Sequence, residues 1–387
     1  MIHPSELRPF FRSEFGQPRA FFAPGRVNVI GEHTDYNDGF VLPMALEMGI
    51  TVLGTPRPDR MLCVTSRQLG DATEIKIDLN TNGLRRTGSW VDYVEGVAQS
   101  LIAAGYQIGG ADLLLASDLP MGAGLSSSAA LEVSVGFALL ALAGLPVDLI
   151  ALARAGQTAE HRWVGTQCGI MDQLASARAR EHCALLIDCR SLDVCDVPLP
   201  QESIAFLVVD TKVKHSLATS AYNFRRAECE RAVAILRGVL PDIQALRDVS
   251  LGDIELHGHL LPASILRRAR HVISENDRVR KTAECFEQRR FDAIGQLLVE
   301  SHRSLQHDYE VSCPELDWLV DAAIRQEGVW GARMTGGGFG GSMVCLVETS
   351  DLGRVESELG ATFVETFGRA PGLFVTKGGQ GACELGQ

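Results

Sequence analysis

The sequence predicts an α+β fold built from two domains. Its 387 residues exceed the usual size of a single domain. Strand-like and helix-like segments both occur, but they do not follow the regular β-α-β alternation of a doubly wound sheet. No unit of about twenty to fifty residues repeats along the chain, so a solenoid or a propeller is not expected.

The individual elements follow from the spacing of the apolar residues. Short alternating or continuous apolar runs predict strands at 47–54, 61–66, 111–116, 184–187 and 205–210. Longer runs with helical spacing predict helices at 128–143, 148–164, 220–240 and 264–275.

The last part of the chain predicts a second, smaller sheet. The segment GARMTGGGFGGSMVCLVE (331–348) places a cluster of glycines between two strand-like flanks, and a further strand is expected at 373–376. The glycines at 336–341 would let backbone approach a substrate or another loop closely, whereas the alternative is a flexible hairpin without contacts. The polar turn PLPQES suggests a boundary, which gives domains at 1–200 and 201–387.

The charge of the chain excludes two classes of partner. The formal net charge of -12 repels nucleic-acid phosphates and anionic lipid surfaces, so neither is an expected partner. The longest apolar stretch, VSVGFALLALAGLPV (133–147), is too short to cross a bilayer and is expected to form a core helix. The N-terminal residues lack the apolar core of a secretory signal, and we therefore expect a cytoplasmic protein.

The segment PMGAGLSSSAALE (120–132) predicts a site for phosphate groups. Gly122 and Gly124 permit backbone conformations that turn successive amides into one concavity, and Ser126–Ser128 begin a helix whose free N–H groups favour negative charge. A serine cap is the alternative, although one serine suffices for a cap. No Gly-Lys-Ser/Thr follows, so the segment is not a Walker A loop and its cationic partner must lie elsewhere.

Magnesium bound with phosphate requires oxygen ligands, typically a hydroxyl and one or two carboxylates. Ser128 supplies a hydroxyl at the helix start, and Glu160 is a candidate carboxylate. Taken alone, Glu160 is more typical of a solvated helix face.

The segment APGRVNVIGEHTDYNDGFVLPMAL (23–46) concentrates charged residues among glycines. They are Arg26, Glu32, His33, Asp35 and Asp38. Ionised carboxylates accept and orient several O–H bonds, so this loop favours a polyol or a sugar as ligand. A polar surface loop that turns at 37–39 is the alternative.

A third polar position is Asp172 in CGIMDQLAS (168–176). An aspartate at this place is often only a helix N-cap. It could equally be a carboxylate in a poorly solvated cleft, where it would orient or deprotonate an attacking hydroxyl. Spacing alone leaves both readings open.

Together these segments resemble a known family. GRVNVIGEHTDYNDG, PMGAGLSSSAALE and GARMTGGGFGGS resemble, in order and spacing, the three motifs of the GHMP small-molecule kinases, and the first resembles the galactokinase signature. CGIMDQ, VKHSLATSAYNFRRAECE, ARHVISEN and SHRSLQHDYEVSCPELD are also similar to galactokinases. The resemblance covers nearly the whole chain, and the ordered set is far more specific than one glycine-rich loop.

The resemblance implies a role for each matching residue. The implied sugar-site residues are Glu32, His33, Asp35, Gly169, Asp172 and Tyr222. Arg26 and Asp172 would act at the transferring phosphoryl group, and Ser128 and Glu160 would bind Mg²⁺. The implied ATP-binding residues are Gly122, Ala123, Gly124, Leu125, Ser126, Ser127 and Ser128.

The resemblance also implies a fold and an activity. The N-terminal domain would be like the second domain of ribosomal protein S5, and the C-terminal domain would be ferredoxin-like. The reaction would be the ATP-dependent phosphorylation of the anomeric hydroxyl of D-galactose, which gives galactose 1-phosphate and ADP. Galactose and ATP would be the small-molecule partners of a monomer.

Two alternatives to this activity remain at the level of sequence. The first is a kinase for a related sugar such as N-acetylgalactosamine, although Cys168 and Ile170 resemble the galactose form. The second is a non-catalytic galactose and ATP sensor. Such sensors resemble galactokinases but are interrupted in the phosphate loop, whereas LSSSAAL is intact in this chain.

Overall fold

The computed structural model describes residues 1–68, 74–81, 86–120, 122–213 and 218–386. Its strands are β1 (Arg19–Asn28), β2 (Phe40–Val41), β3 (Pro43–Arg57), β4 (Met61–Ser66), β5 (Ile75–Asp78), β6 (Gly110–Ser117), β7 (Cys183–Asp188), β8 (Val194–Pro198), β9 (Ile204–Asp210), β10 (Val329–Thr335), β11 (Ser342–Glu348), β12 (Gly372–Thr376) and β13 (Cys383–Leu385). Its helices are α1 (Pro4–Leu7), α2 (Val91–Ala103), α3 (Ser127–Leu142), α4 (Leu149–Ala159), α5 (Met171–Arg178), α6 (Ala218–Leu236), α7 (Leu251–His257), α8 (Ala263–Glu287), α9 (Phe291–Ser304), α10 (Pro314–Ala323) and α11 (Leu352–Phe367).

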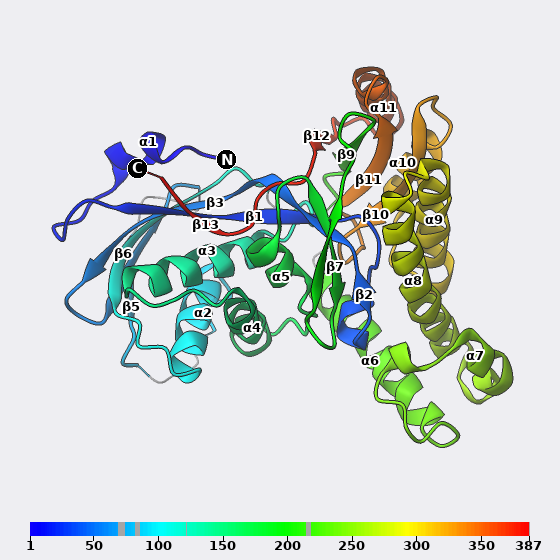
Figure 1. The fold of residues 1–387 in the computed structure, drawn as a ribbon, viewed down its shortest axis with the longest axis horizontal. Helices are drawn as coiled ribbons and strands as arrows, with labels where there is room; N and C mark the ends of the chain where they lie inside the picture. Colours follow the sequence, from blue (N-terminus) through cyan, green and yellow to red (C-terminus); the bar gives the residue numbers. More distant parts are fainter. Residues whose placement is uncertain (69–73, 82–85, 121, 214–217, 387) are drawn as a thin grey trace.

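One end of the molecule is a long sheet with a layer of helices beneath it. The strand order is β13-β1-β3-β6-β4-β5, with β4 and β6 parallel and the other pairs antiparallel. Figure 1 shows α2, α3 and α4 on one side of this sheet. Helix α3 is apolar over most of its surface and is buried along most of its length, as expected for a core helix.

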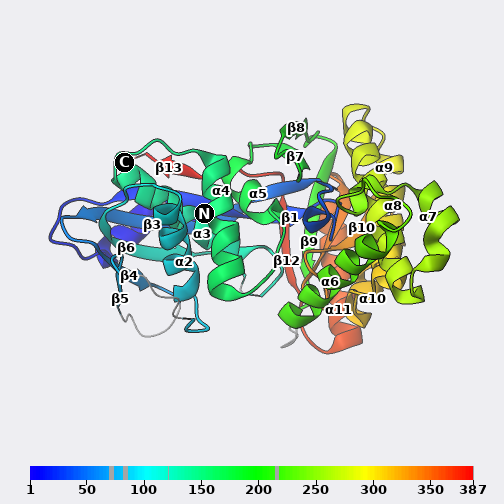
Figure 2. The same ribbon diagram turned by 90° about the horizontal axis from the view of Figure 1, so that it is seen from below.

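The other end is helical and packs on a second sheet. Figure 2 shows this half from another side, with α6 to α11 gathered around β9 to β12. The strand order β10-β11-β9-β12, all antiparallel, is the order of a ferredoxin-like split β-α-β, with α6 to α10 inserted between β9 and β10. The expectation of a ferredoxin-like C-terminal domain is therefore confirmed.

Strand β9 lies between two hydrophobic cores. All seven of its residues are buried. Phe206 and Val208 pack in the core of the first sheet, whereas Leu207 and Val209 pack in the core of the C-terminal helices. Successive side chains of a strand point to opposite faces, so one strand serves both cores.

The chain returns to its first sheet at the end. Strand β13 pairs with β1 through Phe22 and Cys383, and both termini lie in the same half of the molecule (Figure 1). A small third sheet, β2-β7-β8, lies beside α5 and joins the two halves. The division of the chain near residue 200 stays a prediction.

The predicted elements all occur, with differences at their ends. The α+β class is confirmed, and so are the glycine-rich loop between two strands and the strand at 373–376. The helix predicted at 148–164 is α4 followed by a π-helical turn at Glu160–Val164, and α8 is longer than predicted. None of the helices in the described ranges is long and apolar enough to cross a membrane.

The sequence reading missed several elements, among them strand β1 and helices α2, α9 and α11. The segment 23–46, which includes the second half of β1, is predicted as a loop, with its charged residues among glycines and a proline. Proline is tolerated in a strand where one edge is unpaired, and β13 pairs only with residues 20–22 of β1. A bulge between Pro24 and Arg26 absorbs the irregularity and re-aims the following side chain.

Candidate active site

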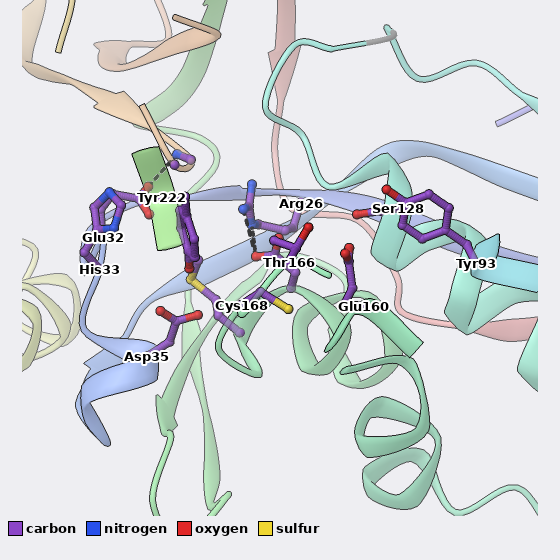
Figure 3. A pocket seen from close by; sticks show the side chains of 14 residues that line it. Arg26, Glu32, His33, Asp35, Tyr93, Ser128, Glu160, Thr166, Cys168 and Tyr222 are labelled. Carbon is purple, nitrogen blue, oxygen red and sulfur yellow. Dashed lines mark hydrogen bonds and ion pairs between the residues drawn. The ribbon is translucent and has the colours of Figure 1, made fainter. Parts of the chain in front are cut away.

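A cavity of about 220 Å³ lies where β1, the start of α3, α5 and the glycine-rich loop meet. In Figure 3, Glu32 and His33 lie toward one end, Ser128 and Tyr93 toward the other, and Arg26 between them. The cavity is lined by Arg26, Glu32, His33, Asp35, Tyr93, Ser128, Glu160, Thr166, Cys168, Met171, Asp172, Tyr222, Gly336 and Gly337. Eight of the predicted site residues therefore line one cavity, whereas Gly169 and residues 122–127 are not part of its lining.

An ion pair between Arg26 and Asp172 lies at the centre of the cavity. Nε and Nη2 of Arg26 each lie 2.8 Å from Oδ1 of Asp172, and the Ser126 hydroxyl donates to Oδ2 at 2.6 Å. Burial opposes the charge of Arg26, but the carboxylates of Asp172 and Glu32 outweigh it and raise its pKa. The N-cap of α5 is Ile170, so the N-cap reading of Asp172 is wrong.

One carboxylate oxygen of Glu32 is fixed by neighbouring donors. Its Oε1 accepts the Gly336 amide at 2.7 Å and lies 3.4 Å from Nη1 of the fully buried Arg333. Glu32 itself is only 2% exposed. These donors orient the carboxylate and leave Oε2 available to a ligand. The reading of this segment as a polar surface loop is wrong, because Arg26, Glu32, His33 and Asp35 are all buried.

Asp35 packs against the backbone of Gly169. A Cβ atom added to Gly169 would lie 2.1 Å from Oδ2 of Asp35, so only glycine leaves room for this carboxylate. Burial, reinforced by the charges of Asp172 and Glu32, raises the pKa of Asp35 to about 7. Asp38, three residues later, is turned away from the cavity and pairs with Arg190 at the surface.

Tyr222, on α6, covers the same end of the cavity. Its ring lies 5.5 Å from the ring of His33 and 5.4 Å from that of Tyr36, measured between centroids. It is thus both a packing residue and part of the cavity wall.

The loop before α3 has the backbone that its glycines predict. Gly122 and Gly124 have φ of 76° and 74°, and Ser126 is also left-handed at 57°. The Ser126 side chain makes no capping bond to the helix among the described residues, and its hydroxyl goes to Asp172 instead. The simple serine-cap alternative is therefore wrong, and the N-terminus of α3 faces the cavity.

Backbone carbonyls attach this loop to its surroundings. Gly124 O accepts Nη1 of Arg26 at 2.8 Å, Leu125 O accepts the Arg26 amide, and Ala123 O accepts the Ser342 hydroxyl at 2.7 Å. These three carbonyls are therefore bonded to the protein, whereas Gly122 and Ser127 of the same loop are exposed to solvent. Met121, just before the loop, lies outside the described residues.

Glu160 lies beside Ser128 at the start of α3. It is 6% exposed, so its reading as a solvated helix-face residue is wrong. Burial raises its pKa to about 7, against hydrogen bonds from Ser128 and Thr166. The hydroxyl groups of Ser128 and Thr166 and the carboxylate of Glu160 therefore lie together beside the N-terminus of α3.

The glycine-rich loop approaches the loop before α3 closely. A Cβ atom on Gly336, whose φ is 85°, would lie 2.9 Å from Gly124 O. Gly337 lines the cavity, and its Cβ atom would meet the ring of Tyr222 at 3.3 Å. The predicted close approach is confirmed, and the flexible hairpin without contacts is wrong.

Comparison with known proteins identifies the family. Residues 9–56 match the galactokinase galactose-binding signature, 92–180 the GHMP kinases N terminal domain, and 282–365 the GHMP kinases C terminal domain. The chain is 47% identical to galactokinase of Chloroflexus aggregans over 383 residues, covering 98% of this chain and 97% of that protein. It is 45% identical to human galactokinase over 353 residues, 89% of this chain and 88% of that one. The chain belongs to the galactokinase family.

The galactokinase fold is matched along the full length. The structure of Lactococcus lactis galactokinase complexed with galactose superposes with a TM-score of 0.94 at 34% identity, covering 98% of both chains. This agreement confirms the expected two-domain GHMP kinase fold. A mevalonate kinase structure matches with a TM-score of 0.60 at 16% identity and shares the fold alone.

The sequence reading missed a second, apolar cavity of about 490 Å³. It adjoins the first cavity through Tyr93 and Ser128, which line both. Its remaining lining residues are Ile50, Ser66, Gln68, Trp90, Leu115, Ala116, Ser117, Leu119, Ser127 and Leu131. The aromatic pair Trp90 and Tyr93 at the start of α2 was the available signal, but two aromatics beside an amphipathic helix are more typical of a core.

Proposed function

We propose that this chain transfers the γ-phosphoryl group of ATP to the anomeric hydroxyl of D-galactose, giving galactose 1-phosphate and ADP. One observation carries the proposal: the Arg26–Asp172 ion pair joins a carboxylate-lined pocket to the loop before α3. Membership in the galactokinase family supports galactose as the sugar, over N-acetylgalactosamine, and catalysis over a sensor role.

The sugar would lie at the end of the cavity that holds Glu32, His33 and Asp35. Their carboxylates accept sugar O–H groups, and the imidazole adds a further polar contact. Gly169 admits Asp35 to this position, and Tyr222 would cover the sugar.

ATP would lie across the start of α3. The amides of Gly122–Ser128 and the helix N-terminus favour its phosphates. The apolar cavity beside Trp90 and Leu115 suits the flat nucleobase, because it removes a largely apolar surface from water.

Mg²⁺ fits the oxygen atoms beside the helix start. Ser128 and Glu160 would hold it, with Thr166 as a further hydroxyl close by, and the phosphates and water would complete the shell. When bound, the ion neutralises phosphate charge.

The chain's own residues would carry the proton and the charge of the transfer. Asp172 accepts the proton of the anomeric hydroxyl, or orients it, as the new O–P bond forms and the bond to ADP breaks. Arg26 and Ser126 each donate one hydrogen bond to Asp172, and Nη2 of Arg26 adds an ion-pair contact, so the orientation of Asp172 is fixed. Arg26 also offsets negative charge on the transferring oxygens.

The deciding experiment is ADP formation with a panel of sugars. Galactose, N-acetylgalactosamine, arabinose and glucose are compared under identical conditions, with magnesium and with chelator. We expect strong turnover with galactose and magnesium only. Binding of galactose and ATP without product over a long incubation would favour a sensor, and preference for N-acetylgalactosamine would favour the related kinase.

The expectations of a monomer and of a cytoplasmic location belong to this proposal. Size-exclusion chromatography with light scattering should give the mass of one chain, 41.9 kDa. Cell fractionation would test the location.

A further inference from the structure

His33 carries an unsatisfied polar atom at the sugar end of the cavity. The residue lines the cavity and is 3% exposed, with a left-handed backbone at φ 64°. Its Nδ1 lies 2.7 Å from the Tyr36 hydroxyl. Its Nε2 is buried and has no hydrogen-bond partner among the described residues. A buried polar atom without a partner is costly, so Nε2 is the atom left for a ligand.

The ring is neutral, so it carries one proton. Burial, with the nearby charges of His271 and Arg225, holds the pKa of His33 well below its usual value. A neutral imidazole donates from one nitrogen and accepts at the other. Nε2 therefore donates to a sugar if Nδ1 is the acceptor, and it accepts from a sugar if Nδ1 carries the proton.

A chain of hydroxyl groups runs from Nδ1 into the interior. The Tyr36 hydroxyl lies 2.8 Å from the Tyr309 hydroxyl, which lies 3.1 Å from Sγ of Cys229. Tyr309 and Cys229 are buried, with 0% and 1% exposure. Each group has one proton to give, so all members of the chain point the same way once one end is set.

The chemistry of the two groups sets that end. A phenol O–H is a stronger donor than the N–H of a neutral imidazole, and an imidazole nitrogen is a stronger acceptor than a phenol oxygen. Nδ1, which lies 2.7 Å from the Tyr36 hydroxyl, is therefore the acceptor, and the ring proton lies on Nε2. Tyr36 then donates to Nδ1, Tyr309 donates to Tyr36, and the Cys229 thiol donates to Tyr309.

We propose that Tyr36 and Tyr309 are positioning residues for sugar recognition: their hydroxyl chain holds Nδ1 of His33 as an acceptor and keeps a donor, Nε2–H, facing the sugar. The inference rests on the proposed sugar site. It gives that site one donor among the carboxylate acceptors Glu32 and Asp35. A sugar hydroxyl whose oxygen faces Nε2 is thereby recognised as an acceptor.

Kinetics of Tyr36→Phe and Tyr309→Phe test the proposal, because each change removes one oxygen and keeps the ring. We expect KM for galactose to rise about ten-fold, equivalent to about 1.4 kcal/mol, while KM for ATP changes less than about two-fold. Tyr106→Phe, a partly buried tyrosine beside the first core, is the matched control and should leave all constants unchanged.

Substrate analogues separate positioning from general damage. Galactoses that each lack one hydroxyl are compared in wild type and in the two variants. The KM penalty should vanish for the one analogue that lacks the hydroxyl facing Nε2. An equal penalty for every analogue, or no penalty for any sugar, would overturn the proposal.

Nitrogen NMR of ligand-free protein gives a readout that needs no activity. With ¹⁵N-labelled histidine and His33→Gln for assignment, the ring shifts should show one tautomer protonated at Nε2 in wild type and a mixture in Tyr36→Phe. Tyr36 is only partly buried, so we expect Tyr36→Phe to fold and to provide the test even if Tyr309→Phe does not fold. Unchanged shifts would refute the inference, whereas absence of galactose phosphorylation in wild type would refute only the proposed function.

Discussion

At the scale of single residues, the carboxylates of Glu32, Asp35 and Asp172 line the same cavity as Arg26. The charges of Asp172 and Glu32 both act on Asp35, and the ion pair that Arg26 forms among the described residues is with Asp172. Each carboxylate therefore has a different environment. Asp172 accepts two hydrogen bonds and is ion-paired with Arg26, whereas Asp35 is buried without an ion pair among the described residues. The former suits proton handling at the transfer, and the latter suits sugar binding.

Asp172→Asn tests the charge at the centre of the cavity. The change keeps the shape but removes the proton acceptor and leaves Arg26 buried without its counter-charge. We expect kcat to fall by about 10²- to 10⁴-fold, measured by ADP release at saturating substrates. Asp59→Asn is the control, because Asp59 also pairs with an arginine but at the surface. Near-normal turnover in Asp172→Asn would contradict both roles of Asp172.

The raised pKa of Asp35 predicts that kcat/KM for galactose depends on pH. Since its pKa is raised to about 7, the carboxylate is protonated in acid and ionised above neutrality. The ionised form accepts stronger hydrogen bonds from hydroxyl groups. At saturating ATP and magnesium, kcat/KM for galactose should rise from pH 6 to pH 8. Asp38→Asn, in the same loop, should keep this profile, and a flat wild-type profile would rule out the assignment.

The same rise in the pKa of Asp35 predicts how the stability of the ligand-free protein depends on pH. Between the ordinary value of 3.8 and about 7, the folded state retains a proton on Asp35 that the unfolded state has lost. Stability therefore falls as pH rises through this window, by an amount on the order of 2 to 4 kcal/mol from this group. Urea unfolding at pH 5 and pH 8 should show a smaller fall for Asp35→Asn than for wild type. An equal fall in both would show that Asp35 is not the group responsible.

At the scale of elements, the site is assembled where loops of different elements touch backbone to backbone. The loop before α3 meets β1 through Gly25, whose added Cβ atom would lie 2.6 Å from Leu125 O. It meets the glycine-rich loop through Gly336. Glycine is needed at both contacts because a side chain would separate the loops. The Gly336 amide also holds Glu32, so one loop supports both the phosphate and the sugar ends.

Gly336→Ala tests this contact. Alanine would meet Gly124 O at 2.9 Å and would also be strained at φ 85°. We expect KM for both substrates to rise and kcat/KM to fall by about ten-fold or more, since a displacement of about 1 Å is costly to catalysis. Gly368→Ala separates strain from contact, because Gly368 is left-handed at 68° but an added Cβ would meet no described atom within 4 Å. Equal kinetic losses in the two variants would refute the contact as the cause.

At the scale of the whole molecule, the two halves share β9 and the small third sheet, and the chain end returns to β1. The cavity lies where these parts meet. The lining of this cavity runs from Arg26 to Gly337 in the sequence, so a ligand bound there would contact residues far apart in the chain. Binding to the folded state alone should therefore stabilise the whole chain.

Thermal unfolding with each ligand tests this expectation. A ligand at one hundred times its Kd contributes about 2.7 kcal/mol, so Tm should rise by several degrees with galactose and with ATP and magnesium. Asp35→Asn should abolish the galactose shift and keep the ATP shift, whereas Trp90→Ala should do the reverse. Glucose is the control sugar. Loss of both shifts in both variants would argue against two separate subsites.

The sequence by itself determined the chemistry of the motifs. The left-handed glycines, the helix start at 126–128 and the acidic loop follow from local rules, because backbone conformation and side-chain type depend on few neighbours. The predicted strands and helices follow from apolar periodicity for the same reason.

Only the tertiary structure decided how these parts act on one another. The Arg26–Asp172 pair joins residues 146 positions apart, and the pKa of Asp35 depends on burial that the whole chain creates. Strand β1 forms despite Pro24 because its neighbours pair with it, and Trp90 lines a cavity because β6 and α3 lie opposite. Contacts between distant residues arise from packing of the complete fold, which no local pattern contains.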